Sequence, residues 1–147
     1  MSIKIYTDGS ATPTRSGIGV FFGLNDPRNI SEEISGTNQY AELYAIYKAL
    51  SSINPIKYLK VTICTDSMYS INCITKWIDN WKVNNWKTSK NKDVKHKELI
   101  QKIDKLVKNN VFFKHVNSHR KEPSLDSNKW VDWFGNDYAD KLALGSI

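Results

Sequence analysis

Four carboxylates stand in contexts that suit metal binding and phosphate chemistry, namely Asp8, Glu42, Asp66 and Asp140. Asp8 follows Tyr-Thr and precedes Gly-Ser, and Asp66 lies in the similar run Cys-Thr-Asp-Ser. A turn or a helix cap would explain either aspartate alone, but not the same Thr-Asp context at two predicted strand ends. Carboxylates that converge in one cleft repel unless cations neutralise them, and their hard oxygens suit Mg²⁺ or Mn²⁺. The sequence therefore predicts a site for a divalent metal.

The first part of the chain predicts an antiparallel meander. Apolar residues alternate with polar ones over residues 3–7, and this strand is expected to run into Asp8. Residues 18–22 and 30–35 form the second and third predicted strands, and the connections between the strands are short.

The following segments predict parallel strands. A helix over residues 37–54, a strand over 59–65 and a helix over 66–78 give an alternation of strand and helix, which is typical of parallel pairing. If the strands that end at Asp8 and Asp66 are parallel neighbours, both carboxylates lie at the carboxyl edge of the sheet. Open α/β sheets bind their ligands at this edge.

The second half of the chain completes one predicted α/β domain over residues 1–147, built on a mixed sheet. Its predicted segments are a polar loop over 81–93, an amphipathic helix over 94–107, a fifth strand over 111–116, a loop over 120–129 and a last helix over 133–144. Glu42 lies one turn into the first helix, and Asp140 lies in the last one.

The net charge of +6, from 21 Lys and Arg against 15 Asp and Glu, is concentrated in one segment. Residues 76–97 contain seven lysines and two aspartates, so they carry five of the six net positive charges. Trp77, Trp81 and Trp86 lie among these lysines. A basic, aromatic-rich segment is typical of proteins that bind a polyanion such as nucleic acid. The alternative is a solvated lysine-rich helix whose tryptophans face the core.

The composition excludes several classes of protein. With 147 residues, of which 40% are hydrophobic, the chain is long enough for one domain with a sizeable core. It has no apolar run of the roughly 18 residues that a membrane-spanning helix needs, and its amino terminus lacks the apolar region of a signal peptide. Cys64 and Cys73 form no Cys-x-x-Cys pair, which argues against a thiolate zinc site and a disulfide framework. We expect two buried cysteines in a protein that acts inside the cell, in the cytoplasm or, for a eukaryote or a virus, in the nucleus.

Taken together, these motifs make the sequence similar to the type 1 ribonucleases H. The motifs that carry the resemblance span nearly the whole chain in the family's order: Tyr6-Thr7-Asp8-Gly9-Ser10, Ala41-Glu42-Leu43-Tyr44-Ala45, Thr65-Asp66-Ser67 and Asn136-Asp137-Tyr138-Ala139-Asp140-Lys141-Leu142-Ala143. Trp77-Ile78-Asp79-Asn80-Trp81 and Trp86-Lys87-Thr88 also resemble the family's basic protrusion, here around residues 76–97. The resemblance implies the ribonuclease H-like α/β fold, a five-stranded mixed sheet of an antiparallel meander and parallel strands flanked by helices.

The same resemblance implies an endonuclease that hydrolyses the RNA strand of RNA–DNA hybrids and leaves 5′-phosphate and 3′-hydroxyl ends. Asp8, Glu42, Asp66 and Asp140 would be the catalytic carboxylates and hold two Mg²⁺ ions, with Mn²⁺ as the alternative. Glu42 would also lie near the 2′-hydroxyl that distinguishes RNA. His119 corresponds to a loop histidine that assists proton transfer or product release, a task that suits an imidazole. An exposed loop histidine without function is the alternative.

The resemblance also implies a set of contacts with the hybrid. These residues are Gly9, Ser10, Asn38, Gln39, Ser67, Trp77, Trp81, Lys82, Trp86, Lys87 and Lys90. A simple helix N-cap is the alternative role of Asn38.

Several features of the sequence leave alternatives open. Asp137 lies three residues before Asp140 near the same helix face, although the Ala-Asp-x-Leu-Ala context favours Asp140. His115 and His119 are four residues apart, but no further Cys or His nearby completes a zinc site. The segment between His119 and Asp140 is longer than in the compact bacterial members, so residues 120–133 are expected to form a lid or an additional contact with the hybrid.

Two other functions fit parts of this pattern. Another nuclease or strand-transfer enzyme with the same fold, such as a junction resolvase or a transposase core, is one alternative. A hybrid-binding module without catalysis is the other, but it would not need all four carboxylates. The starting Met and the complete domain favour a monomer that acts alone, and association with a polymerase is also compatible with the sequence.

Overall fold

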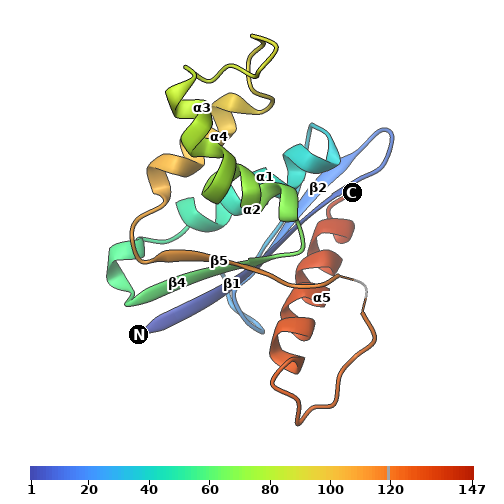
Figure 1. The fold of residues 1–147 in the computed structure, drawn as a ribbon. Coiled ribbons are helices and arrows are strands. Elements are labelled where there is room, and N and C mark those ends of the chain that lie inside the picture. The colour runs from blue at the N-terminus through green and yellow to red at the C-terminus, as the bar shows by residue number, and fades with distance from the viewer. Residues whose placement is uncertain (119) are drawn as a thin grey trace.

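Five strands form one sheet at the centre of the computed structural model, which describes residues 1–118 and 120–147. The strands are β1 (Ser2–Ala11), β2 (Ser16–Phe21), β3 (Ile30–Ile34), β4 (Lys60–Thr65) and β5 (Val111–His115). Their order in the sheet is β3-β2-β1-β4-β5 (Figure 1). The first three strands pair antiparallel, whereas β1, β4 and β5 run parallel to one another. The predicted mixed sheet, a meander extended by parallel strands, is therefore confirmed.

Strand β1 is longer than the sequence predicted. Its parallel pairing with β4 stops at Thr7, but its antiparallel pairing with β2 continues through Asp8 to Ala11. The hairpin that follows is closed by a hydrogen bond of 2.7 Å from the Thr12 N–H to the Arg15 carbonyl oxygen. Because this hairpin keeps the two strands paired, Asp8 lies in extended backbone inside β1 and not in a turn at its end.

Helices cover both faces of the sheet (Figure 1). One face carries α1 (Asn38–Ser51), α2 (Met68–Asn72), α3 (Ile78–Val83) and α4 (Lys97–Leu106), and the other carries α5 (Trp130–Gly145). A π-helical turn (Cys73–Trp77) joins α2 to α3, and a short 3-10 turn (Pro55–Lys57) precedes β4. In the part of the chain that the structure describes, no helix is both long enough and apolar enough to cross a membrane.

Several helix boundaries differ from the predictions. α3 extends to Val83, inside the segment predicted to be a loop. α4 begins at Lys97, three residues later than predicted, because His96 adopts a left-handed conformation with a φ of 62°. α5 begins three residues earlier than predicted, at Trp130, whose ring stacks on Phe134 one turn later with centroids 4.9 Å apart. Such a contact between residues four apart stabilises the first turn of a helix.

Hydroxyl side chains cap the two helices that begin near the carboxyl edge of the parallel strands. The Thr37 hydroxyl accepts a hydrogen bond of 3.2 Å from the Tyr40 N–H at the start of α1. Thr37 is therefore the N-cap, and the alternative that Asn38 caps this helix is wrong. The Ser67 hydroxyl caps α2 in the same way, accepting from the Ser70 N–H at 3.1 Å.

The main core lies between the sheet and the helices α1 and α4. Its fully buried side chains include Ile5, Val20, Leu43, Ile46, Leu50, Ile63, Ile100 and Ile103. A smaller cluster under α5 contains Tyr6, Phe21, Cys64 and Ala139. Cys64 and Cys73 are both buried and unpaired, as predicted. Each large apolar side chain buried in these layers stabilises the fold by roughly 1.5–3 kcal/mol, so helices on both faces are held firmly against β1.

β1 and α1 approach each other closely at Gly9. A Cβ atom at this position would overlap the backbone of Ala41 and Glu42, with the Ala41 carbonyl carbon only 2.5 Å away. Backbone atoms can give way only if the whole helix shifts, so the packing of α1 on β1 requires a glycine here. Gly9 therefore sets how closely α1 packs on β1, and so how close Glu42 lies to the sheet.

We predict that Gly9→Ala destabilises the protein by about 1–3 kcal/mol, the usual cost of overpacking a tight contact. Urea denaturation measures the change in unfolding free energy. Gly23→Ala is the matched control, because a Cβ at Gly23 meets no atom within 4 Å. Equal stability of the two variants would show that the close approach at Gly9 is not required.

Candidate active site

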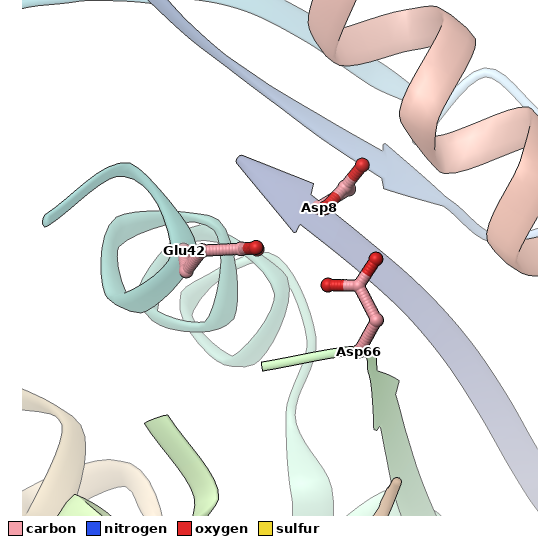
Figure 2. A group of neighbouring side chains, drawn as sticks. All are labelled: Asp8, Glu42 and Asp66. Atoms are coloured by element: carbon pink, nitrogen blue, oxygen red, sulfur yellow. The ribbon is translucent and has the colours of Figure 1, made fainter. Parts of the chain in front are cut away.

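The ends of two parallel strands bring Asp8 and Asp66 together. Thr7 of β1 lies opposite Thr65, the last residue of β4, and each threonine is followed directly by an aspartate. A parallel register places equivalent positions at the same edge of the sheet. The two carboxylates therefore lie close together, as the repeated Thr-Asp context predicted (Figure 2).

Glu42 reaches the same place from α1. Its side chain is buried, and its Oε1 accepts a hydrogen bond of 2.8 Å from the Gly9 N–H, which orients the carboxylate. Asp8, Glu42 and Asp66 each offer a carboxylate oxygen, and these atoms lie within 4.8 Å of one another (Figure 2). Across residues 1–118 and 120–147, no other three His, Cys, Asp or Glu side chains converge in this way.

Burial and mutual repulsion raise the pKa values of Asp8 and Glu42. Burial is the largest cause for Asp8, whose pKa rises to about 9, and the negative charges of Asp66 and Asp140 add to it. Burial likewise raises the pKa of Glu42 well above its usual range, and the charges of Asp8 and Asp66 contribute. Carboxylates this close together in a buried site cannot all stay ionised unless positive charge compensates them.

The donor atoms fit a hard divalent cation. Asp8, Glu42 and Asp66 supply only oxygen ligands, which Mg²⁺ and Mn²⁺ prefer. A cation held between them would offset the repulsion that contributes to the raised pKa values of Asp8 and Glu42. Because the ligands must lose protons to bind it, metal affinity should increase with pH.

Asp140 approaches the group from α5, on the other face of the sheet from α1. Its charge and a hydrogen bond contribute to the raised pKa of Asp8, although it is not one of the three mutually closest carboxylates. Asp137, one turn earlier, forms an ion pair of 3.0 Å with Lys141 on its own helix. Of the two aspartates considered on α5, Asp140 is the one that interacts with Asp8.

A small cavity of about 30 Å³ beside Asp66 and Asp140 is also lined by Asn136, a residue that the sequence did not single out. Asn136 is only 6% exposed, and its Oδ1 has no hydrogen-bond partner within the described part of the chain. Its position four residues before Asp140 was the available signal, because residues at this spacing share a helix face.

Of the two histidines considered from the sequence, the structure describes only His115. His119 lies outside the described residues. His115 lies in β5, as predicted, and is the last residue of this strand; its Nε2 lies 3.3 Å from the backbone oxygen of Asp66. Among the described residues, His115 belongs to no cluster of potential metal ligands.

The tryptophans of the basic segment pack on the core. Trp77, Trp81 and Trp86 are half-buried and form a chain of ring contacts, with successive centroids 6.0 and 6.1 Å apart. The sequence left open the alternative that these tryptophans face the core, and the buried part of their rings does pack there. They also give the segment a rigid base.

The lysines of the basic segment differ in their partners. Lys82 pairs with Asp104 and Lys87 pairs with Asp93, each at 2.8 Å. Lys90 is exposed and has no carboxylate within 4.0 Å among the residues that the structure describes. Of these three predicted contacts, Lys90 therefore has the charge that is least compensated.

The remaining predicted contacts lie close to the carboxylate group in the chain. Asn38 and Gln39 are exposed in the first turn of α1, and Ser10 follows Asp8 by two residues in β1. The Gln39 Oε1 accepts a hydrogen bond of 3.4 Å from Lys95. This contact connects the start of α1 to the basic segment.

A family model described as RNase H matches residues 1–146. The chain belongs to the RNase H family. Ribonuclease H1 of Rattus norvegicus is 35% identical over 150 residues, which cover 97% of this chain and 49% of the rat protein. Ribonuclease H of Francisella philomiragia is 38% identical over 152 residues, which cover 99% of this chain and 91% of the bacterial protein. This RNase H chain thus spans about half the length of its rat relative and most of the length of the bacterial one.

A solved structure with the same fold supports this membership of the RNase H family. The foamy viral protease-reverse transcriptase in complex with RNA/DNA hybrid aligns with a TM-score of 0.78 and 27% identity. The alignment covers 98% of this chain and 20% of the viral chain. The family and the fold expected from the sequence motifs are both confirmed.

We predict that Asp8→Asn stabilises the metal-free protein at neutral pH by about 1–2 kcal/mol. Folding raises the pKa of Asp8 from an ordinary value of 3.8 to about 9, so the folded state keeps a proton that the unfolded chain releases. The wild-type protein therefore loses stability as the pH rises between these two values. The uncharged amide removes this loss. Urea denaturation with a chelator across this pH range measures the effect.

Added Mg²⁺ should make the wild type more stable than the Asp8→Asn variant. Binding to the folded state raises the unfolding free energy of the wild type, whereas Asp8→Asn lacks one ligand. Asp126→Asn, which alters an exposed loop residue, is the control and should behave as the wild type. An Asp8→Asn variant that is less stable than the wild type without metal would contradict the repulsion described above.

Proposed function

We propose that this member of the RNase H family hydrolyses the RNA strand of RNA–DNA hybrids. The observation that carries the proposal is the buried group of Asp8, Glu42 and Asp66, with Asp140 beside it, at the carboxyl edge of the parallel strands. Two relatives named ribonuclease H1 and ribonuclease H align with nearly the whole chain, and the foamy viral enzyme was solved with an RNA/DNA hybrid. These likenesses support the choice of substrate.

The carboxylate group would hold two Mg²⁺ ions, with Mn²⁺ as the alternative. When bound, such ions would activate a water for attack on the phosphodiester and would stabilise the departing 3′-oxygen. The products then carry 5′-phosphate and 3′-hydroxyl ends. Asp8 interacts with Glu42, Asp66 and Asp140, so its carboxylate would be central to the set of residues that holds the metal.

Other groups near the carboxylates would select and position the RNA strand. Glu42, held by the Gly9 N–H, would lie near the 2′-hydroxyl that distinguishes RNA from DNA. Asn38, Gln39 and Ser10 would contact the minor groove of the hybrid. Gly9 is buried against α1, so it would contribute to hybrid binding by letting α1 bring Glu42 close to β1. In this proposal His119 assists proton transfer or product release.

The basic segment would bind the hybrid away from the cut. Lys82, Lys87 and Lys90 would contact phosphates, supported by the tryptophans packed beneath them, and Ser67 would contact the strand next to Asp66. We expect a monomer that acts inside the cell, and an association with a polymerase is also compatible with the sequence.

The decisive experiment incubates the protein with end-labelled RNA, alone and annealed to DNA or to RNA, with and without Mg²⁺. We expect cleavage of the RNA in the RNA–DNA hybrid only, and only with metal. Cleavage of branched DNA instead would indicate the junction resolvase alternative. Metal-independent binding without cleavage, also with Mn²⁺, would indicate a hybrid-binding module.

We predict that Asp66→Asn abolishes cleavage but leaves hybrid binding largely intact, because binding depends mainly on phosphate contacts. Cleavage assays and hybrid titrations of the same preparation separate the two effects. Asp137→Asn is the matched control and should still cleave, since Asp137 pairs with Lys141. Equal losses of binding and cleavage in Asp66→Asn would contradict this division of roles.

We further predict that replacing Lys82, Lys87 and Lys90 with glutamine weakens hybrid binding. The slope of log affinity against log salt concentration should fall by about 1 to 3, because each lysine that neutralises a phosphate adds roughly one unit to the slope. The smaller value is expected if the ion pairs of Lys82 and Lys87 persist in the complex. An unchanged slope would mean that these lysines are exposed to solvent but do not contact the phosphates of the hybrid.

A further inference from the structure

A groove of about 480 Å³ lies beside the candidate active site and has no part in the cleavage steps proposed for the carboxylates. It is bounded by the end of β5, the loop over residues 120–129 and the start of α5. Figure 1 shows this loop extending from the sheet and returning to α5. The volume is within the range of about 300–1,000 Å³ that is usual for ligand sites.

The groove is strongly cationic. Its lining includes Lys114, Arg120, Lys121 and Lys129, and the one carboxylate that the described residues contribute to it belongs to Asp132. This carboxylate is already engaged, because it pairs with Lys114 at 2.6 Å and with Lys4 at 3.2 Å. Asp132 therefore compensates none of the charge on the loop.

Arg120, Lys121 and Lys129 carry the uncompensated charge. All three are exposed, and within residues 1–118 and 120–147 no carboxylate lies within 4.0 Å of their cationic groups. Like charges gathered in a concave surface focus the electric field and attract anions. A groove of this kind fits the phosphates of a nucleic acid.

Indole hydrogen bonds hold the loop in place. The Trp133 Nε1–H donates to the Arg120 carbonyl oxygen, and the Trp130 Nε1–H donates to the Glu122 Oε2, both at 2.9 Å. Trp130 in turn stacks on Phe134. The start of α5 thus fixes the backbone that carries the cations, and a preorganised site loses less entropy on binding.

Arg120 connects the groove to the carboxylates. It lines the groove and also the small cavity that contains Asp66 and Asp140. A strand whose phosphate lies at these carboxylates can therefore continue past Arg120 into the groove. The strand that does so is the one that is cut.

We propose that this groove binds backbone phosphates of the RNA strand next to the scissile phosphate. Arg120, Lys121 and Lys129 form the contacts, and the loop over residues 120–129 thereby becomes an additional contact with the hybrid. This inference rests on the proposed function, because it takes the strand at the carboxylates to be RNA.

The test compares two triple variants in hybrid binding with a chelator present, so that no cleavage occurs. Arg120→Gln, Lys121→Gln and Lys129→Gln together should lower the slope of log affinity against log salt by about 2 to 3. The control removes three exposed charges at the opposite end of the sheet, before β4 and β5, through Lys57→Gln, Lys105→Gln and Lys108→Gln. The control should keep the wild-type slope.

A second measurement identifies the strand. Neutral methylphosphonates are placed next to the expected cut, either in the RNA strand or in the DNA strand. If the groove binds RNA, the RNA substitution weakens binding by the wild type but has little further effect on the loop variant, since both changes remove the same interaction. The inference would be overturned if the losses of binding caused by the RNA substitution and by the loop variant simply add. It would also be overturned if only the DNA substitution is coupled to the loop variant.

The outcomes separate this inference from the proposed function. If the wild type cleaves the hybrid but the loop variant keeps the wild-type salt slope, the proposed role of the groove is overturned and the proposed function stands. A wild type that neither binds nor cleaves the hybrid would overturn both. If the triple variant fails to fold, Lys121→Gln alone should lower the slope by about 1, because this side chain is exposed.

Discussion

The repulsion between buried carboxylates is the constraint on which the rest of this structure depends. Asp8, Glu42 and Asp66 lie within 4.8 Å of one another, and burial raises the pKa of Asp8 and of Glu42 because the ionised forms lose hydration. A chain selected for stability alone would separate these side chains. Their convergence destabilises the metal-free protein and provides a ligand set for a divalent cation, a compromise that is typical of active sites.

The fold opposes this repulsion with contacts on both faces of β1. The parallel register with β4 fixes two of the carboxylates, and the close approach at Gly9 fixes the helix that carries the third. On the other face, Asp132 near the start of α5 accepts hydrogen bonds of 2.5 Å from Tyr6 and 2.6 Å from Lys114. These contacts fasten the helix that carries Asp140 to the strands beneath it. The carboxylates are thus held by strands and helices, which position side chains more rigidly than loops do.

Two cationic surfaces accompany the carboxylate group, and they are built differently. The basic segment around residues 76–97 has a base of half-buried tryptophans, and three of its lysines are paired with aspartates. The loop over residues 120–129 has no core beneath it and depends on indole hydrogen bonds from the start of α5. Its cations have no such partners among the described residues, so they are free to meet phosphates. A hybrid held at both surfaces would be fixed on either side of the cut.

The sequence by itself determined the order of the strands and helices, the family, and the pairing of the two Thr-Asp motifs, because these depend on local periodicity and on short motifs. It could not show that β1 continues past Asp8, since that extension requires pairing with β2. Nor could it show that Asp104 partners Lys82, or that Asn136 is buried beside Asp140 without a hydrogen-bond partner among the described residues. The tertiary structure decided these features and the cationic groove. They arise where segments far apart in the chain meet, and their distances, burial and charge are set only by packing.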